Sequence, residues 1–225
     1  MLPHIDDGSR SAEMTRSMLE ESKRQGVSIQ IATPHFYASH DTPEHFLEKR
    51  AKAFEAVKPI ADELGIELLT GAEVAFFRGM SEAEALKSLL IADTDLLLLE
   101  MPFRQWTESD IREVKQMIQK GIHPVIAHIE RFTAYQKDKG PYEALFGMDV
   151  TVQVNAEALL SFRPRGHALK LFKNGTAKIL ASDSHNTSSR PQNLQEGRAI
   201  LTKKLGKDIL RILDGEGERL LSRKR

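Results

Sequence analysis

The chain has 225 residues, with 32 Lys and Arg residues against 32 Asp and Glu residues, and it contains no Cys. Its length fits one compact α/β domain, its balanced charge argues against nucleic-acid binding driven by phosphate neutralisation, and the lack of Cys excludes disulfides, thiolate metal ligands and a cysteine nucleophile. No apolar run approaches the roughly 18 residues of a membrane span and no secretion leader is recognisable, so we expect no membrane insertion, which is compatible with a cytoplasmic protein.

Short apolar, β-branched runs alternate with longer helical patterns along the whole chain. Six of these runs are predicted to be strands: residues 28–33, 66–70, 95–100, 123–128, 150–155 and 177–182. Several are apolar at consecutive positions, as in strands buried on both faces of a parallel sheet. No linker or change in composition divides the chain, so residues 1–225 are predicted to form a single β/α domain, either an open sheet or a closed barrel.

The segments between the strands carry the residues that begin and end helices. Ser81 with Glu84, and Thr107 with Asp110, have the spacing of a capping box, which predicts a helix N-terminus at each place. Four glycines follow helical patterns, where a left-handed residue is needed: Gly26, Gly65, Gly121 and Gly175.

Five of the six predicted strands lead into a side chain that can bind a metal. These side chains are His35, Glu73, Glu100, His128, and the pair Asp183 and His185. In a parallel β/α barrel the carboxyl ends of all strands meet at one rim, so residues far apart in sequence would come together there. Each residue alone could be a turn or helix-capping residue, but their recurrence at five strand ends predicts a polynuclear metal site.

The chemistry of this set narrows the choice of metal. A carboxylate at the end of an apolar run, such as Glu100 in the sequence LLLLE, is costly to bury unless a cation or another partner neutralises it. Carboxylates and imidazoles without sulfur suit Mn²⁺, Fe or Zn²⁺ better than Cu(I), and there are too many imidazoles for a Ca²⁺ site. The other histidines are assigned to turns, loops and packing. The aromatic residues Phe103 and Trp106, which follow Glu100, could line a pocket but are assigned to packing.

Two arginines lie in predicted loops on the same rim. Arg131 comes three residues after His128, and Arg190 comes five residues after His185. A guanidinium group matches two phosphate oxygens at once, so metals and arginines together predict a phosphate ester as substrate.

Seven motifs carry a resemblance to a known family. They are residues 4–8 (HIDDG), 32–35 (ATPH), 71–73 (GAE), 99–103 (LEMPF), 125–131 (VIAHIER), 153–155 (QVN) and 181–186 (ASDSHN). In this order they resemble the polymerase and histidinol phosphatase (PHP) superfamily, and within it the bacterial manganese-dependent tyrosine-protein phosphatases of capsule and exopolysaccharide operons.

The resemblance implies a distorted (β/α)7 TIM-like barrel with up to three Mn²⁺ ions at the strand ends. By matching motifs, the ligands of the first ion would be Asp7, His35 and His185; those of the second would be Glu73, Glu100 and His128; and Asp183 would join Glu73 on the third. Arg131 and Arg190 would bind the phosphate. The implied substrate is phosphotyrosine on a partner, an autophosphorylated bacterial tyrosine kinase that regulates polysaccharide synthesis in the cytoplasm.

The sequence departs from the family pattern at its start. The pattern has a His-x-His pair at the end of a first strand, just before Leu-Pro, and this chain begins at Met1-Leu2-Pro3. We therefore expect the chain to lack the first strand of the barrel and two ligands of one ion, to bind fewer ions tightly, and to be less active than a longer chain.

Two other functions remain open from the sequence. PHP proteins include hydrolases of small phosphoesters such as histidinol phosphate, which would keep the fold and change the substrate. A chain without the His-x-His pair could also be a module that binds phosphotyrosine through Arg131 and Arg190 without hydrolysing it.

Overall fold

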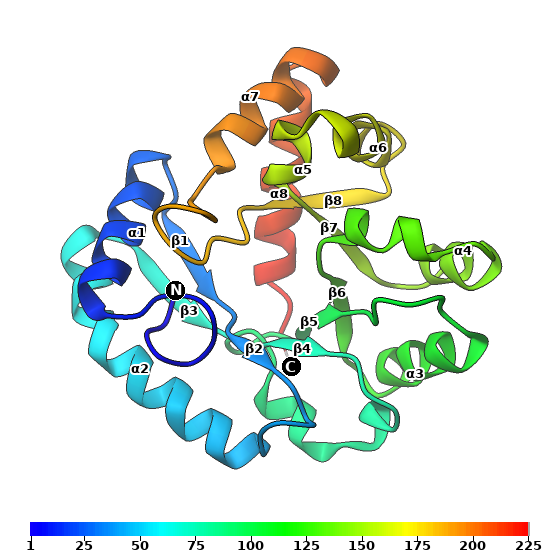
Figure 1. The fold of residues 1–225 in the computed structure, drawn as a ribbon, viewed down its shortest axis with the longest axis horizontal. Helices are drawn as coiled ribbons and strands as arrows, with labels where there is room; N and C mark the ends of the chain where they lie inside the picture. The colour runs from blue at the N-terminus through cyan, green and yellow to red at the C-terminus, as the bar shows by residue number, and fades with distance from the viewer. Residues whose placement is uncertain (225) are drawn as a thin grey trace.

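Parallel strands with helices between them make up the fold, which a computed structural model describes over residues 1–224. The strands are β1 (Ile29–Ala32), β2 (His35–Phe36), β3 (Glu67–Thr70), β4 (Glu73–Ala75), β5 (Leu96–Glu100), β6 (His123–Ile126), β7 (Thr151–Asn155) and β8 (Ala177–Ala181). The helices are α1 (Ala12–Arg24), α2 (Pro43–Leu64), α3 (Glu108–Gln119), α4 (Gly140–Phe146), α5 (Ala156–Leu160), α6 (Phe162–Lys173), α7 (Leu194–Leu205) and α8 (Asp208–Leu221). Figure 1 shows the strands towards the middle, with α1, α2, α3, α4, α6 and α7 around them.

The strands form two parallel sheets. One sheet has the order β2-β4-β5-β6-β7-β8, and the other pairs β1 with β3. All six predicted strands are confirmed. The sequence did not indicate β2 and β4, which are two and three residues long and follow β1 and β3 after the breaks at Pro34 and Gly71.

The predicted parallel β/α fold is confirmed, and within residues 1–224 the strands are not hydrogen-bonded into a closed barrel, so the distorted TIM-like barrel stays a prediction. The edge strands β2 and β8 of the larger sheet do not pair with each other, and β1 and β3 stand as a separate pair. The two sheets nevertheless share one inner core, because Ile31 of β1 and Ile179 of β8 pack on the same cluster as Leu96 and Leu98. Leu220 of α8 belongs to this cluster, and Figure 1 shows α8 running from the periphery to the middle.

The consecutive leucines of β5 are explained by burial on both faces. Leu96 and Leu98 lie in the inner cluster, whereas Leu97 and Leu99 lie in the larger core that the surrounding helices complete. Each of the four is at most 6% exposed. This is the pattern expected of a parallel strand covered on both sides.

Most of the predicted helix signals are confirmed. All four glycines after helical patterns have a positive φ, between 67° and 82°, and Thr107 and Asp110 form a reciprocal capping box at the start of α3. The prediction of a capping box at Ser81 is wrong. The chain there forms two 3-10 turns, Met80–Glu82 and Glu84–Ser88, and the Ser81 hydroxyl bonds to Gln116 instead. No helix within residues 1–224 is both long and apolar enough to cross a bilayer.

Gly197 is required where α7 approaches α5. A Cβ atom at this position would lie 2.7 Å from the Cβ of Ala156, which is closer than carbon atoms can pack. We expect Gly197→Ala to lower the free energy of unfolding by about 1–3 kcal/mol, as in other overpacked cores. The measurement is urea denaturation. The control is Gly215→Ala in α8, where an added Cβ meets no atom within 4 Å and should be neutral or stabilising by about 0.5–1 kcal/mol. Equal stability of the two variants would contradict the prediction.

Candidate metal centre

The side chains predicted to bind metal come from strand ends that the sheet places next to one another. In the parallel pairing of β2 with β4, His35 is opposite Glu73, and in the pairing of β4 with β5, Ala75 is opposite Glu100. His128 follows β6, and Asp183 and His185 follow β8. Asp7 comes from the N-terminal loop before α1, which lies across the same end of the strands.

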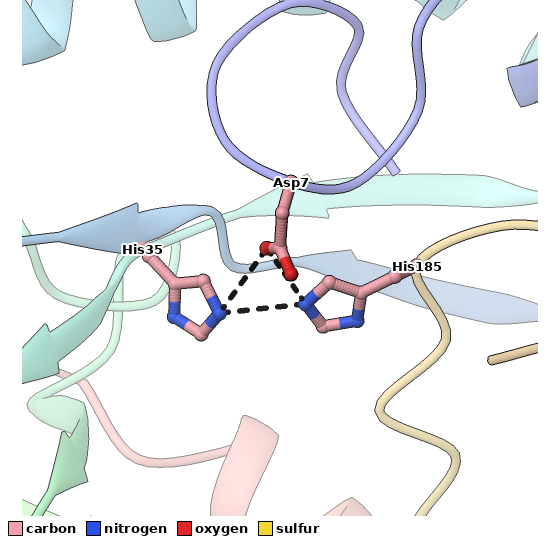
Figure 2. Close-up of side chains that lie close together, drawn as sticks. All are labelled: Asp7, His35 and His185. Atoms are coloured by element: carbon pink, nitrogen blue, oxygen red, sulfur yellow. Dashed lines mark hydrogen bonds and ion pairs between the residues drawn. The ribbon is translucent and has the colours of Figure 1, made fainter. Parts of the chain in front are cut away.

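Asp7, His35 and His185 form the first group, which we call group 1. Figure 2 shows the three side chains pointing at one another, and their ligand atoms all lie within 4.8 Å of each other. The Nε2 atoms of His35 and His185 are 3.4 Å apart, and Asp7 Oδ1 lies 3.7 and 3.3 Å from them. His185 Nδ1 donates a hydrogen bond to the backbone oxygen of Asp183 at 2.9 Å, which leaves the lone pair on Nε2 facing the group.

Glu73, Glu100 and His128 form the second group, which we call group 2. Their ligand atoms also lie within 4.8 Å of each other. His128 Nε2 is 2.9 Å from Glu73 Oε1 and 3.4 Å from Glu100 Oε1, and the His128 side chain is almost completely buried. Glu73 also connects the two groups, because its Oε1 lies 3.9 Å from His35 Nδ1.

The donor atoms of both groups fit a divalent metal. Each group offers carboxylate oxygen and imidazole nitrogen atoms converging on one point, which is the ligand chemistry of Mn²⁺, Fe and Zn²⁺. Two carboxylates close together repel each other, so Glu73 and Glu100 need a cation between them. In group 2 the imidazole itself supplies that positive charge. Burial would lower the pKa of His128, but its hydrogen bonds to Glu100 and Glu73 outweigh this and raise the pKa to about 9.

A metal ion that binds group 2 must therefore displace a proton from His128. Since the pKa of His128 is about 9, the imidazole is protonated at pH 7 and becomes neutral only as the pH rises through 9. We expect the apparent affinity for Mn²⁺ to rise by about tenfold per pH unit between pH 7 and 9 and then to level off. Calorimetric titrations in buffers of different ionisation enthalpy measure the protons released. An affinity that is constant over this range, with no proton released at pH 7, would contradict the prediction.

Asp183 lies between the two arginines and does not belong to either group. Its Oδ2 accepts hydrogen bonds from Arg131 Nη2 and Arg190 Nη2, both at 2.8 Å, and from Asn155 Nδ2 at 2.7 Å. Burial would raise the pKa of Asp183, but the guanidinium groups of Arg131 and Arg190 outweigh it and lower the pKa below its usual value. Arg190 also reaches Asp7, with Nη1 3.3 Å from Oδ2, so the predicted phosphate-binding residues adjoin group 1.

Two site residues have a backbone conformation that only glycine adopts easily. The φ angle is 30° at His128 and 51° at Asp183. Such residues store about 1–3 kcal/mol each and occur where the surrounding structure holds them for a function.

The sequence interpretation missed two supporting residues. Asp6 accepts hydrogen bonds from the backbone N–H groups of Gly8 and His35, which fixes the N-terminal loop to β2. Asn155, at the end of β7, is buried and orients Asp183. Asp6 lies in the motif at residues 4–8, and Asn155 lies in the motif at residues 153–155. The sequence signal for Asn155 was a polar residue at the end of a predicted apolar strand. The five other histidines, His4, His40, His45, His123 and His167, do not join either group.

Comparison with known proteins gives a consistent result over the whole chain. The family model of capsular polysaccharide synthesis, CpsB/CapC, matches residues 1–221. Tyrosine-protein phosphatase CpsB of Streptococcus agalactiae serotype V is 30% identical over 216 residues, which cover 91% of this chain and 88% of the relative. Tyrosine-protein phosphatase YwqE of Bacillus subtilis is 26% identical over 225 residues, covering 98% of this chain and 89% of the relative.

A solved structure is also similar. It comes from work described as crystal structures of YwqE from Bacillus subtilis and CpsB from Streptococcus pneumoniae, unique metal-dependent tyrosine phosphatases. It superposes with a TM-score of 0.84 at 25% identity, over 100% of this chain and 92% of that one.

Proposed function

This chain belongs to the CpsB/CapC family of capsular polysaccharide synthesis, and from that premise we propose that it is a metal-dependent protein-tyrosine phosphatase. The relatives that share its sequence and fold carry this activity in their names. The proposal rests above all on one observation: two metal-binding groups and two arginines lie at the same end of the strands.

Groups 1 and 2 are the metal sites of this proposal. Asp7, His35 and His185 would hold one ion, and Glu73, Glu100 and His128 a second. Mn²⁺ is the proposed metal, because it accepts this mixture of oxygen and nitrogen ligands. Such an ion supplies Lewis-acid chemistry and lowers the pKa of water, which suits phosphate ester hydrolysis. A third ion between Glu73 and Asp183 is a further proposal that the family resemblance implies.

The arginines bind the phosphate group in this proposal. Arg131 and Arg190 each have a guanidinium group next to Asp183, and their side chains are 33% and 29% exposed, so both can reach a ligand from solvent. They stabilise the negative charge that grows on the equatorial oxygens of phosphorus during displacement. Asp183 and Asn155 hold the two arginines in position.

Hydrolysis proceeds without a phosphoenzyme on cysteine, since the chain contains no Cys. The partner we propose is an autophosphorylated bacterial tyrosine kinase that regulates capsule synthesis, and the chain would meet it in the cytoplasm. The two sheets are proposed to be the parts of a distorted PHP barrel, which is supported by the core that Ile31 and Ile179 share.

The experiment that tests this function compares two substrates with the Mn²⁺-loaded chain. A phosphotyrosine peptide should be hydrolysed with a higher kcat/KM than histidinol phosphate. A preference for histidinol phosphate would point to a small-molecule hydrolase. Tight binding of the peptide without release of phosphate would point to a binding module.

A further inference from the structure

Exposed aromatic side chains gather beside the metal-binding groups. Among residues 1–224, four aromatic residues rank as exposed: Tyr37, Phe103, Tyr135 and Phe162. Three of them lie near the histidines of groups 1 and 2, either in direct ring contact or through Phe103. The Tyr37 ring lies 5.7 Å from the His35 ring, the Phe103 ring lies 6.2 Å from the His128 ring, and Tyr135 contacts Phe103.

The two aromatic residues after Glu100 differ in exposure. Trp106 is a packing residue as predicted, being 1% exposed, whereas Phe103 is 47% exposed and fits the alternative that it lines a pocket. The ring of Phe103 lies nearly parallel to that of His128, with an angle of 17° between the planes. It packs on the buried ring of Phe132 at 4.8 Å, with Tyr135 against it edge-on at 6.0 Å.

This arrangement fixes Phe103 while leaving part of its ring open to solvent. The Phe103 ring adjoins group 2 through His128, and it packs on Phe132, which follows Arg131 in the chain. A phenylalanine ring left in water forgoes the favourable free energy that burial would give. The exposed part of the Phe103 ring therefore offers an apolar surface to a ligand.

We propose that Phe103, with Tyr135 at its side, is the surface that recognises the aromatic ring of the substrate. The inference rests on the proposed phosphatase function and adds to it the residue that selects aryl phosphates over alkyl phosphates. With the phosphate at Arg131 and Arg190, the ring of a phosphotyrosine stacks on Phe103, which gives contact area and aromatic pairing that a serine or small aliphatic ester cannot provide. Phe103 is therefore a specificity-determining residue.

Two phosphonates that are not hydrolysed test the proposal. Phenylphosphonate and methylphosphonate present the same phosphonate group and differ in the ring, so the ratio of their dissociation constants reports recognition of the ring alone. Both constants are measured by calorimetry with the Mn²⁺-loaded chain. We expect the wild-type chain to prefer phenylphosphonate, and Phe103→Ala to reduce this preference by roughly tenfold, with the affinity for methylphosphonate unchanged within about twofold.

Matched variants separate ring recognition from a structural effect. Phe103→Trp keeps an aromatic surface and should keep the preference, and Phe162→Ala, which removes a phenylalanine that is 90% exposed, should leave it unchanged. An unchanged preference in Phe103→Ala, a parallel loss of affinity for both phosphonates, or a loss of preference in Phe103→Trp overturns the proposal.

The proposed function can fail separately. If the wild-type chain hydrolyses phosphotyrosine but shows no preference for phenylphosphonate, ring recognition alone is refuted. If it neither hydrolyses phosphotyrosine nor binds either phosphonate, the phosphatase function fails, and the proposal on Phe103 fails with it.

Discussion

Replacing His185 with alanine should lower the rate of phosphotyrosine hydrolysis by on the order of a thousandfold. His185 contributes one of the two imidazoles of group 1, and its Nε2 lies 3.3 Å from Asp7 and 3.4 Å from His35. Without it, Asp7 and His35 alone would be too few ligands to hold an ion tightly. A bound ion contributes several kcal/mol of charge stabilisation, and each 1.36 kcal/mol corresponds to about a factor of ten in rate.

The measurement is kcat at saturating Mn²⁺ together with the metal content of the purified chain. His45→Ala is the matched control, since His45 pairs with Asp41 on the surface and its side chain is 62% exposed. The control should keep its activity within about twofold. If His185→Ala keeps both its metal content and its kcat, group 1 is not a metal site.

Replacing either arginine with alanine is expected to lower kcat/KM for a phosphotyrosine peptide by about 10²–10³-fold, the range found when one donor to a developing oxyanion is removed. Arg131 and Arg190 both bond to Oδ2 of Asp183, so the losses should not add in the double variant. Arg131→Lys and Arg190→Lys should recover little, because an ammonium group lacks the planar pair of donors.

Steady-state kinetics of the single, double and lysine variants check this prediction. Arg16→Ala is the control, because Arg16 makes an exposed ion pair with Glu63 and should be neutral. Lysine variants with wild-type kcat/KM would show that charge alone is sufficient. Additive losses would show that the two arginines act independently of their shared carboxylate.

The sequence was informative about the fold wherever a segment is long and its pattern is repeated. The apolar run of β5 and the capping box of α3 could be assigned because burial on two faces and a helix N-terminus leave local signs in the residue types. The strands β2 and β4 could not be found, since two or three residues carry no periodicity. The division of the strands into two sheets depends on hydrogen bonds between distant strands, which no local pattern encodes.

The candidate site was predictable to the level of residue type and position. Acidic and histidine residues at strand ends identify a rim, and the structure brings six of the seven predicted ligands into groups 1 and 2. The sequence did not indicate that Asp183 is hydrogen-bonded to three side chains, those of Arg131, Arg190 and Asn155. The exposure of Phe103 was equally hidden, because it depends on packing against Phe132 and Tyr135.

The most direct test of a metal-dependent phosphatase is one activity measurement on the same preparation under three treatments. Hydrolysis of a phosphotyrosine peptide should be lost with a chelator, return when Mn²⁺ is added in excess, and be unaffected by a thiol-alkylating reagent, since the chain has no Cys. Activity that persists after complete removal of metal would contradict the assignment of groups 1 and 2 as the catalytic metal centre.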